Sequence, residues 1–119
     1  MKLRAQLGWA LMVIGGVGVS ACGGEDGVAT GSTCPSDSDL TYDSFGQAFF
    51  QTNCLVCHGA KGPESPKFDT RDQIFANRSE IDKQAAAGPD GVNTAMPESG
   101  SVSDADRRKL GEWLACGAP

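Results

Sequence analysis

The apolar positions divide the chain into three stretches of different character. Residues 7–19 form a continuous apolar, glycine-rich run, whereas residues 23–39 are rich in Gly, Ser, Thr and Asp and show no periodic apolar pattern. From Leu40 onward the apolar residues recur at helical spacing. The pattern therefore predicts a helical domain over residues 40–119, preceded by a flexible tether over residues 22–39.

Capping residues and apolar spacing predict where the helices of this domain begin. The first helix begins after the N-cap residue Thr41 and runs toward the next cysteine. Two shorter helices begin at Thr70, which has capping-box spacing to Gln73, and at Ser79. The last helix begins at Ser103. Its predicted apolar face consists of Ala105, Leu110, Trp113 and Leu114.

Between these helices the sequence predicts loops. Gly59–Lys67 and Gly88–Val102 are both rich in glycine and contain proline, which disfavours regular structure. Almost no run alternates polar and β-branched residues in the way that half-buried strands do. The expected fold class is therefore all-α.

Residues 1–21 have the organisation of a secretory signal. Lys2 and Arg4 precede the apolar run, which at 13 residues is shorter than the roughly 20 that span a bilayer. Val19–Cys22 resembles a bacterial lipobox, in which a lipid is attached to the cysteine sulfur and cleavage occurs before it. Ordinary cleavage after Ala21 is the alternative, because small residues also precede that bond. We expect an exported protein of the bacterial cell envelope, anchored through Cys22 to a membrane facing the periplasm, with the inner and the outer membrane both left open.

The charge balance changes once the signal is removed. Residues 22–119 number 98 and carry 8 basic and 15 acidic side chains, because both signal charges are positive. Such an acidic surface argues against nucleic acid as a partner and favours a protein partner with a basic or neutral patch. A domain of this size has a marginal hydrophobic core, so we also expect it to need cross-links or a buried cofactor.

Cys54, Cys57 and His58 form the pattern C-x-x-C-H, which is the attachment site of a c-type haem. The two thiols reach two vinyl groups on one porphyrin edge, and the imidazole reaches the iron from the same side. A loop carbonyl should accept a hydrogen bond from the other ring nitrogen, and Pro63 is slightly favoured over Pro66 for this role. Two alternatives fit less well: a thioredoxin-like pair requires a βαβ context, and a structural zinc site requires four ligands.

Met96 is the predicted second axial ligand of the iron. It is the only methionine left after removal of the signal, and His58 is the only histidine of the chain. A thioether is a soft ligand that favours ferrous iron. The alternative is that Met96 fills a gap in the core. Its position before Pro97 in a polar, glycine-rich loop makes that role less suitable.

The chain has five cysteines, and an odd number in an exported protein requires an explanation. Lipid would use Cys22 and the haem would use Cys54 and Cys57, which leaves Cys34 and Cys116 to form a disulfide. Two free thiols or an intermolecular pair are the alternatives. A bridge would close a loop of about 83 residues and stabilise the fold by up to roughly 4.5 kcal/mol in the chain-entropy model.

From Thr41 to the C-terminus the chain resembles a small class I cytochrome c, and in particular the lipid-anchored mono-haem members from bacteria. Besides C-x-x-C-H and the Met-Pro pair, the resemblance rests on two helices that carry Gly46, Phe50, Leu110 and Trp113. It implies three to five helices wrapped around one covalently bound haem, with the N- and C-terminal helices packed together. In the family, the glycine of the first helix lets an aromatic ring of the last approach closely.

The resemblance implies electron transfer by one haem c with His58 and Met96 as axial ligands, and no enzymatic activity. Redox-partner proteins and, through the lipid, a membrane surface are the expected partners. A haem-based ligand binder or peroxidase-like enzyme is the alternative if Met96 dissociates. It is disfavoured because the sequence offers no second histidine and no evident arginine beside Met96. A third hypothesis is a lipoprotein without haem, in which Cys54 and Cys57 form a disulfide.

Overall fold

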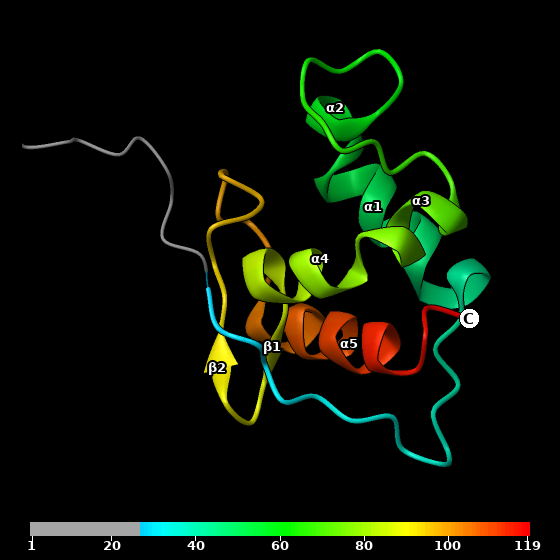
Figure 1. Cartoon of the computed structure of the whole chain (residues 1–119), viewed down its shortest axis with the longest axis vertical. Coiled ribbons are helices and arrows are strands. Elements are labelled where there is room, and N and C mark those ends of the chain that lie inside the picture. The colour runs from blue at the N-terminus through cyan, green and yellow to red at the C-terminus, as the bar shows by residue number, and fades with distance from the viewer. Residues whose placement is uncertain (1–26) are drawn as a thin grey trace, which may run out of the picture.

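The computed structural model describes residues 27–119. Short helices pack around an apolar core, and two short strands form a hairpin (Figure 1). In chain order the elements are η1 (Tyr42–Gly46), α1 (Gln47–Asn53), α2 (Leu55–His58), α3 (Arg71–Ala76), α4 (Arg78–Ala85), β1 (Ala87–Gly88), β2 (Gly91–Val92) and α5 (Asp104–Ala115). Apart from the two-residue strands, the expected all-α class is confirmed. Within these residues no helix has the length and apolar character needed to cross a bilayer. The predicted signal, residues 1–21, and the predicted lipidation site Cys22 lie outside the described residues.

The first helical region begins where its cap predicts, but it is not one continuous helix. The Thr41 hydroxyl accepts a hydrogen bond from the backbone N–H of Ser44, and the Ser44 hydroxyl accepts one from the backbone N–H of Thr41. The π-helical turn η1 follows, then α1. The helix is interrupted at Cys54, whose φ is −123°, and resumes as α2. The interruption gives the segment that carries Cys57 and His58 a short turn of its own.

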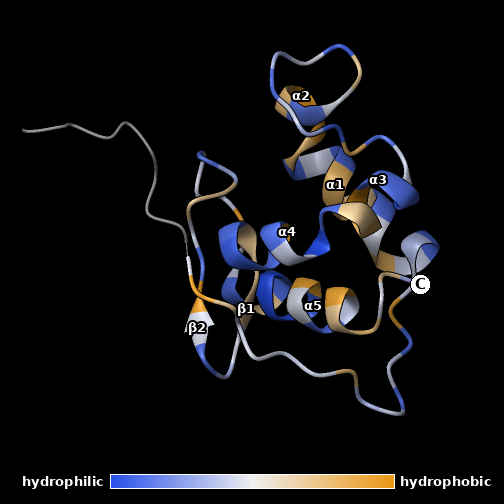
Figure 2. Ribbon diagram, viewed as in Figure 1, coloured by the Kyte–Doolittle hydropathy of each residue, from blue (hydrophilic) through white to orange (hydrophobic). Residues whose placement is uncertain are grey.

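The first and last helical regions pack against each other, as the resemblance implies. A Cβ built on Gly46 would lie 2.5 Å from Cζ2 of Trp113, so the close approach requires glycine. The Phe50 and Trp113 ring centroids are 6.2 Å apart, and both side chains are buried together with Leu110. Figure 2 shows hydrophobic residues in the C-terminal turns of α5 and hydrophilic ones in its first turns. Ala105 is exposed, contrary to prediction, because it lies about 140° around the helix from Leu110.

The short helices α3 and α4 begin close to the predicted residues. Thr70 caps α3 in a capping box with Gln73, as its spacing predicts. Helix α4 ends at Ala85 because Ala86 is extended and leads into the hairpin. In that hairpin Ala87 pairs with Val92. The start of the predicted loop Gly88–Val102 therefore belongs to the hairpin of β1 and β2.

Residues 27–34, which we call the strap, are folded against the domain, so the prediction of a flexible tether over residues 22–39 is wrong in this part. Thr30 is completely buried: its hydroxyl and its backbone N–H donate to the two oxygens of Asp82 at 2.6 and 2.9 Å. The Thr30 carbonyl accepts from the N–H of Asp90. A Cβ on Gly111 of α5 would clash with the Ser32 hydroxyl of the strap and would lie 2.6 Å from the Ala87 carbonyl oxygen, so α5 approaches the strap closely. Composition alone does not show this, because polar residues can be buried when they are hydrogen-bonded.

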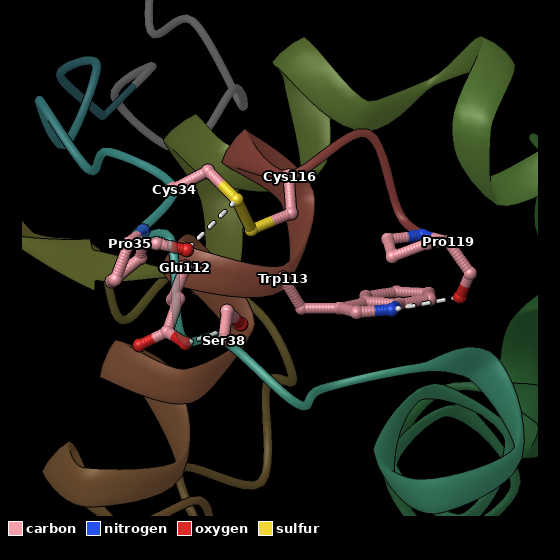
Figure 3. Close-up of a disulfide and its surroundings, with 7 residues drawn as sticks. All are labelled: Cys34, Pro35, Ser38, Glu112, Trp113, Cys116 and Pro119. Atoms are coloured by element: carbon pink, nitrogen blue, oxygen red, sulfur yellow. Dashed lines mark hydrogen bonds between the residues drawn. A yellow bond between two sulfur atoms is a disulfide. The ribbon is translucent and has the colours of Figure 1, made fainter.

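A disulfide joins the end of the strap to the end of α5 (Figure 3). It links Cys34 to Cys116, whose Cα atoms are 4.7 Å apart. Nearby, the Ser38 hydroxyl donates to Glu112 at 2.6 Å. The N-terminal segment is thus held to α5 covalently as well as by hydrogen bonds.

Candidate functional site

The C-x-x-C-H residues form one tight turn, in which Cys54 lies between α1 and α2 and the other four residues make up α2. The carbonyl of Cys54 accepts hydrogen bonds from the backbone N–H groups of Cys57, at 3.2 Å, and His58, at 2.8 Å. Both cysteines are free thiols. Cys54 is partly buried and packs against the core, whereas Cys57 is exposed. One turn therefore presents two thiols and an imidazole together, as the motif predicts.

The two thiols have different surroundings. Burial raises the pKa of the Cys54 thiol to about 12, so this side chain stays protonated at neutral pH. The intervening Val56 has an exposed fraction of 81%. The turn therefore has one sulfur at the edge of the core and one at the surface, and no internal disulfide links them.

The imidazole of His58 is held by the loop that follows the motif. Its Nδ1 is 2.7 Å from the carbonyl oxygen of Pro66, so the slight preference for Pro63 is wrong. The reason lies in the backbone: the N–H of Phe68 donates to the His58 carbonyl, which aligns this part of the loop with the histidine. The Phe68 ring also lies 5.0 Å from the imidazole, centroid to centroid. A ring fixed through Nδ1 leaves Nε2 as the nitrogen that can bind a metal.

Met96 lies on the segment between the hairpin and α5 and packs, partly buried, against the same core as Cys54. Its backbone is held on both sides. The N–H of Met96 donates to the Gln84 carbonyl at 2.8 Å, and its carbonyl accepts from Nη1 of Arg107 at 2.7 Å. The loop that carries this thioether is therefore fixed to α4 and to α5.

These residues fit a c-type haem. Cys54 and Met96 pack against one apolar cluster that includes Phe50, Phe68 and Trp113, and the imidazole lies against the Phe68 ring with one nitrogen available. The second free thiol, Cys57, lies in the same turn at the surface. The alternatives receive no support from the part of the chain that the structure describes. It has no group of three or more His, Cys, Asp or Glu side chains able to hold a metal ion. Its sheet is a single antiparallel hairpin, which is not the βαβ context of a thioredoxin-like pair.

Sequence reasoning missed Arg107. The expectation that no arginine lies beside Met96 is wrong, although the contact is to the Met96 backbone. Arg107 is 2% exposed, and its burial lowers the pKa of the guanidinium while nearby Asp104 acts in the opposite direction. A signal was present, because residue 107 falls on the same helical face as Leu110 and Leu114.

The comparison with protein families gives a match over most of the helical domain. The model of a protein family described as cytochrome C oxidase, cbb3-type, subunit III, matches residues 44–114. This span contains the C-x-x-C-H turn, Met96, Arg107 and the packed helices. No curated protein and no solved structure matches the chain.

Proposed function

Because the chain belongs to the family of the cytochrome c oxidase, cbb3-type, subunit III, and is a small c-type cytochrome, we propose that it carries single electrons on a haem held between His58 and Met96. Its cofactor is covalently attached haem c, whose iron cycles between the ferrous and ferric states. The observation that carries the proposal is the His58 ring. It is fixed by Pro66 beside two free thiols and leaves one nitrogen for the iron.

Each site residue has a separate task. Cys54 and Cys57 would form the thioether links, which would keep the cofactor in place through repeated oxidation and reduction. His58 would bind the iron through its free nitrogen, with the ring orientation set by the Pro66 carbonyl at 2.7 Å. Met96 would supply a thioether ligand, whose soft sulfur favours the ferrous state. With the iron held by both residues, no position would be left for a substrate, which favours electron transfer over catalysis.

Electron exchange with other proteins would take place near the attachment turn, which is the segment Cys54–His58. Val56 and Cys57 are exposed there, so a partner can approach this side of the domain. The acidic balance of residues 22–119 favours partners with a basic or neutral docking patch. Redox encounters of this kind are small and short-lived, which suits a protein kept near its partners by an anchor.

The anchor itself is part of the proposal. Its support is the lipobox-like Val19–Cys22, together with the cysteine count, which leaves Cys22 without another use. Four residues separate Cys22 from Gly27, where the described domain begins, and the five residue steps between the two Cα atoms span at most about 18 Å. The domain would therefore stay close to the membrane surface, on the periplasmic side. A mass spectrum of the mature N-terminus tests this, since an unmodified Cys22 thiol would remove the anchor.

A redox titration of the purified holoprotein tests electron transfer. We expect a reversible one-electron transition with low-spin spectra in both states. We also expect carbon monoxide to bind the ferrous protein only slowly, because Met96 must leave first. Rapid, tight binding of carbon monoxide, or turnover of peroxide, would instead support the ligand-binding or peroxidase-like alternative.

A further inference from the structure

Arg107 is a buried cation on the inner face of α5. The side chain is 2% exposed. Its Nη1 lies within hydrogen-bond distance of three carbonyl oxygens, those of Ala85 at 2.8 Å, Asn93 at 2.9 Å and Met96 at 2.7 Å. Ala85 is the last residue of α4, Asn93 follows β2, and Met96 lies on the segment that leads to α5. One guanidinium group therefore joins three chain segments to α5.

Burying the Arg107 guanidinium away from water costs free energy. Among the described residues, no carboxylate lies within ion-pair distance of Arg107. Taking a charge out of water is expensive, and an apolar side chain of similar size would fill the same space at lower cost. Backbone carbonyls offset part of that cost because hydrogen bonds from a charged donor are strong. What the arginine provides and an apolar residue does not is a fixed position for those carbonyls.

The segment that gains most from this is the one that carries Met96. Residues 93–102, which we call the Met96 loop, connect the hairpin to α5 and contain no helix or strand. The Met96 N–H is held by the Gln84 carbonyl, and the Met96 carbonyl is held by Arg107. Asn93 is held through its carbonyl by the same Nη1. Without the arginine, the loop would keep only one of the two backbone contacts at Met96.

We propose that Arg107 is a positioning residue for the axial ligand: its guanidinium holds the Met96 loop and so keeps the thioether on the iron. The inference rests on the proposed ligation of iron by Met96. A loop that is fixed before ligation loses less conformational entropy when the sulfur binds, so the bond is stronger than one made by a free loop. An outside ligand then competes less well for the iron.

The test measures how tightly imidazole displaces methionine from the ferric holoprotein. Arg107→Met removes the hydrogen bonds while it keeps an apolar side chain of similar length. We expect this change to raise the affinity for imidazole about tenfold, since charged hydrogen bonds to the loop are lost. The reduction potential should fall in the same variant, because a loosened thioether favours the ferrous state less. Arg107→Lys keeps the charge but not the planar group, and should give a smaller increase in affinity.

Two controls separate positioning from a general loss of stability. Arg108→Met changes the next residue of α5, an exposed arginine, and should leave the affinity for imidazole unchanged. Cys34→Ser with Cys116→Ser destabilises the fold away from Met96, and should also leave it unchanged. If imidazole affinity rises as much in this double variant as in Arg107→Met, the inference is overturned.

The remaining outcomes separate the inference from its premise. If the wild-type ferric protein lacks the methionine-to-iron charge-transfer band, Met96 is not the ligand, and both proposals fail. If the band is present and Arg107→Met binds imidazole as wild type does, only the role of Arg107 is wrong. Should Arg107→Met fail to fold, Arg107→Lys decides alone: an affinity equal to that of wild type overturns the inference.

Discussion

Around Cys54–His58 the structure is made by hydrogen bonds between neighbours in one turn, whereas around the strap it is made by contacts between distant parts of the chain. The Cys54 carbonyl binds the N–H groups of residues three and four positions later. Thr30, in contrast, binds Asp82 across 52 positions, and Val28 binds Asn93 across 65. The attachment turn is made by local contacts and is partly exposed. The strap is exposed along most of its length and is joined to the domain by non-local contacts at buried Thr30.

The comparison indicates that the strap contacts stabilise the fold, whereas the attachment turn carries the reactive side chains. Where the strap meets the domain, the polar side chains of Thr30 and Asn93 are buried, and within the described residues no buried side-chain polar atom lacks a hydrogen-bond partner. The strap is also held by the disulfide. In the proposed site, the thiols and the imidazole of the attachment turn would form their bonds only with the cofactor. Changes at the strap contacts should therefore alter the free energy of unfolding, and changes at the attachment turn or Met96 should alter the spectrum.

The largest expected loss of stability comes from the disulfide. Replacing Cys34 and Cys116 by serine opens a loop with a sequence separation of 82. We expect the free energy of unfolding to fall by about 4 kcal/mol, because the unfolded chain regains its conformational entropy. Guanidinium unfolding of the holoprotein measures this. Because the disulfide stabilises the fold and does not contact the iron, the double variant should keep the visible spectrum of wild type. Loss of the methionine-to-iron band in this variant would contradict the prediction.

Asn93→Ala should cause the next largest loss. The Asn93 side chain donates to the carbonyls of Val28, at 2.7 Å, and Asp82, at 2.8 Å, and accepts from the N–H of Val28. Removing it takes three partly buried hydrogen bonds from the contact between the strap and the domain, at a cost of about 3 kcal/mol. Asn53→Ala, which removes a single bond to the Phe49 carbonyl in α1, serves as the matched control and should cost about 1 kcal/mol or less. If the two variants lose the same free energy of unfolding, the Asn93 hydrogen bonds to the strap stabilise the fold no more than the single bond of Asn53.

A smaller loss is expected outside both regions, at the contact of Gly46 with Trp113, where the first helical region packs against α5. The Cβ of Gly46→Ala would lie 2.5 Å from the indole ring, so the helices must move apart. Overpacking of this kind costs about 2 kcal/mol. In a Trp113→Phe background the ring is smaller, and the same alanine should cost less. A double-mutant cycle of thermal unfolding measures the difference, and additive effects would show that the close approach is not what requires glycine.

Much of the attachment turn could be predicted from sequence, because C-x-x-C-H encodes its geometry within five residues. The caps at Thr41 and Thr70 were predictable for the same reason. The strap and the Pro66 acceptor were not, since both depend on how separate segments meet. The polar composition around Thr30 suggested a tether, and only its contact with Asp82 shows why a threonine is buried there.

The smallest expected effect lies on the exposed face of α5. Arg108 pairs with Asp104 at 2.8 Å, and both side chains are more than half exposed to solvent. We expect Arg108→Ala to lower the free energy of unfolding by about 0.3–0.5 kcal/mol, because solvent screens such pairs. Added salt should reduce even this loss. A loss comparable to that of Asn93→Ala would mean that stability is not concentrated in the buried network.

The ferric optical spectrum of the wild-type holoprotein, compared with that of Met96→Ala, tests the central claim most directly. We predict that the wild type shows the methionine-to-iron charge-transfer band, and that the variant loses it while keeping its haem through Cys54 and Cys57. The variant should also bind carbon monoxide rapidly when reduced. A Met96→Ala protein whose ferric and ferrous spectra match those of wild type would contradict a haem held between His58 and Met96.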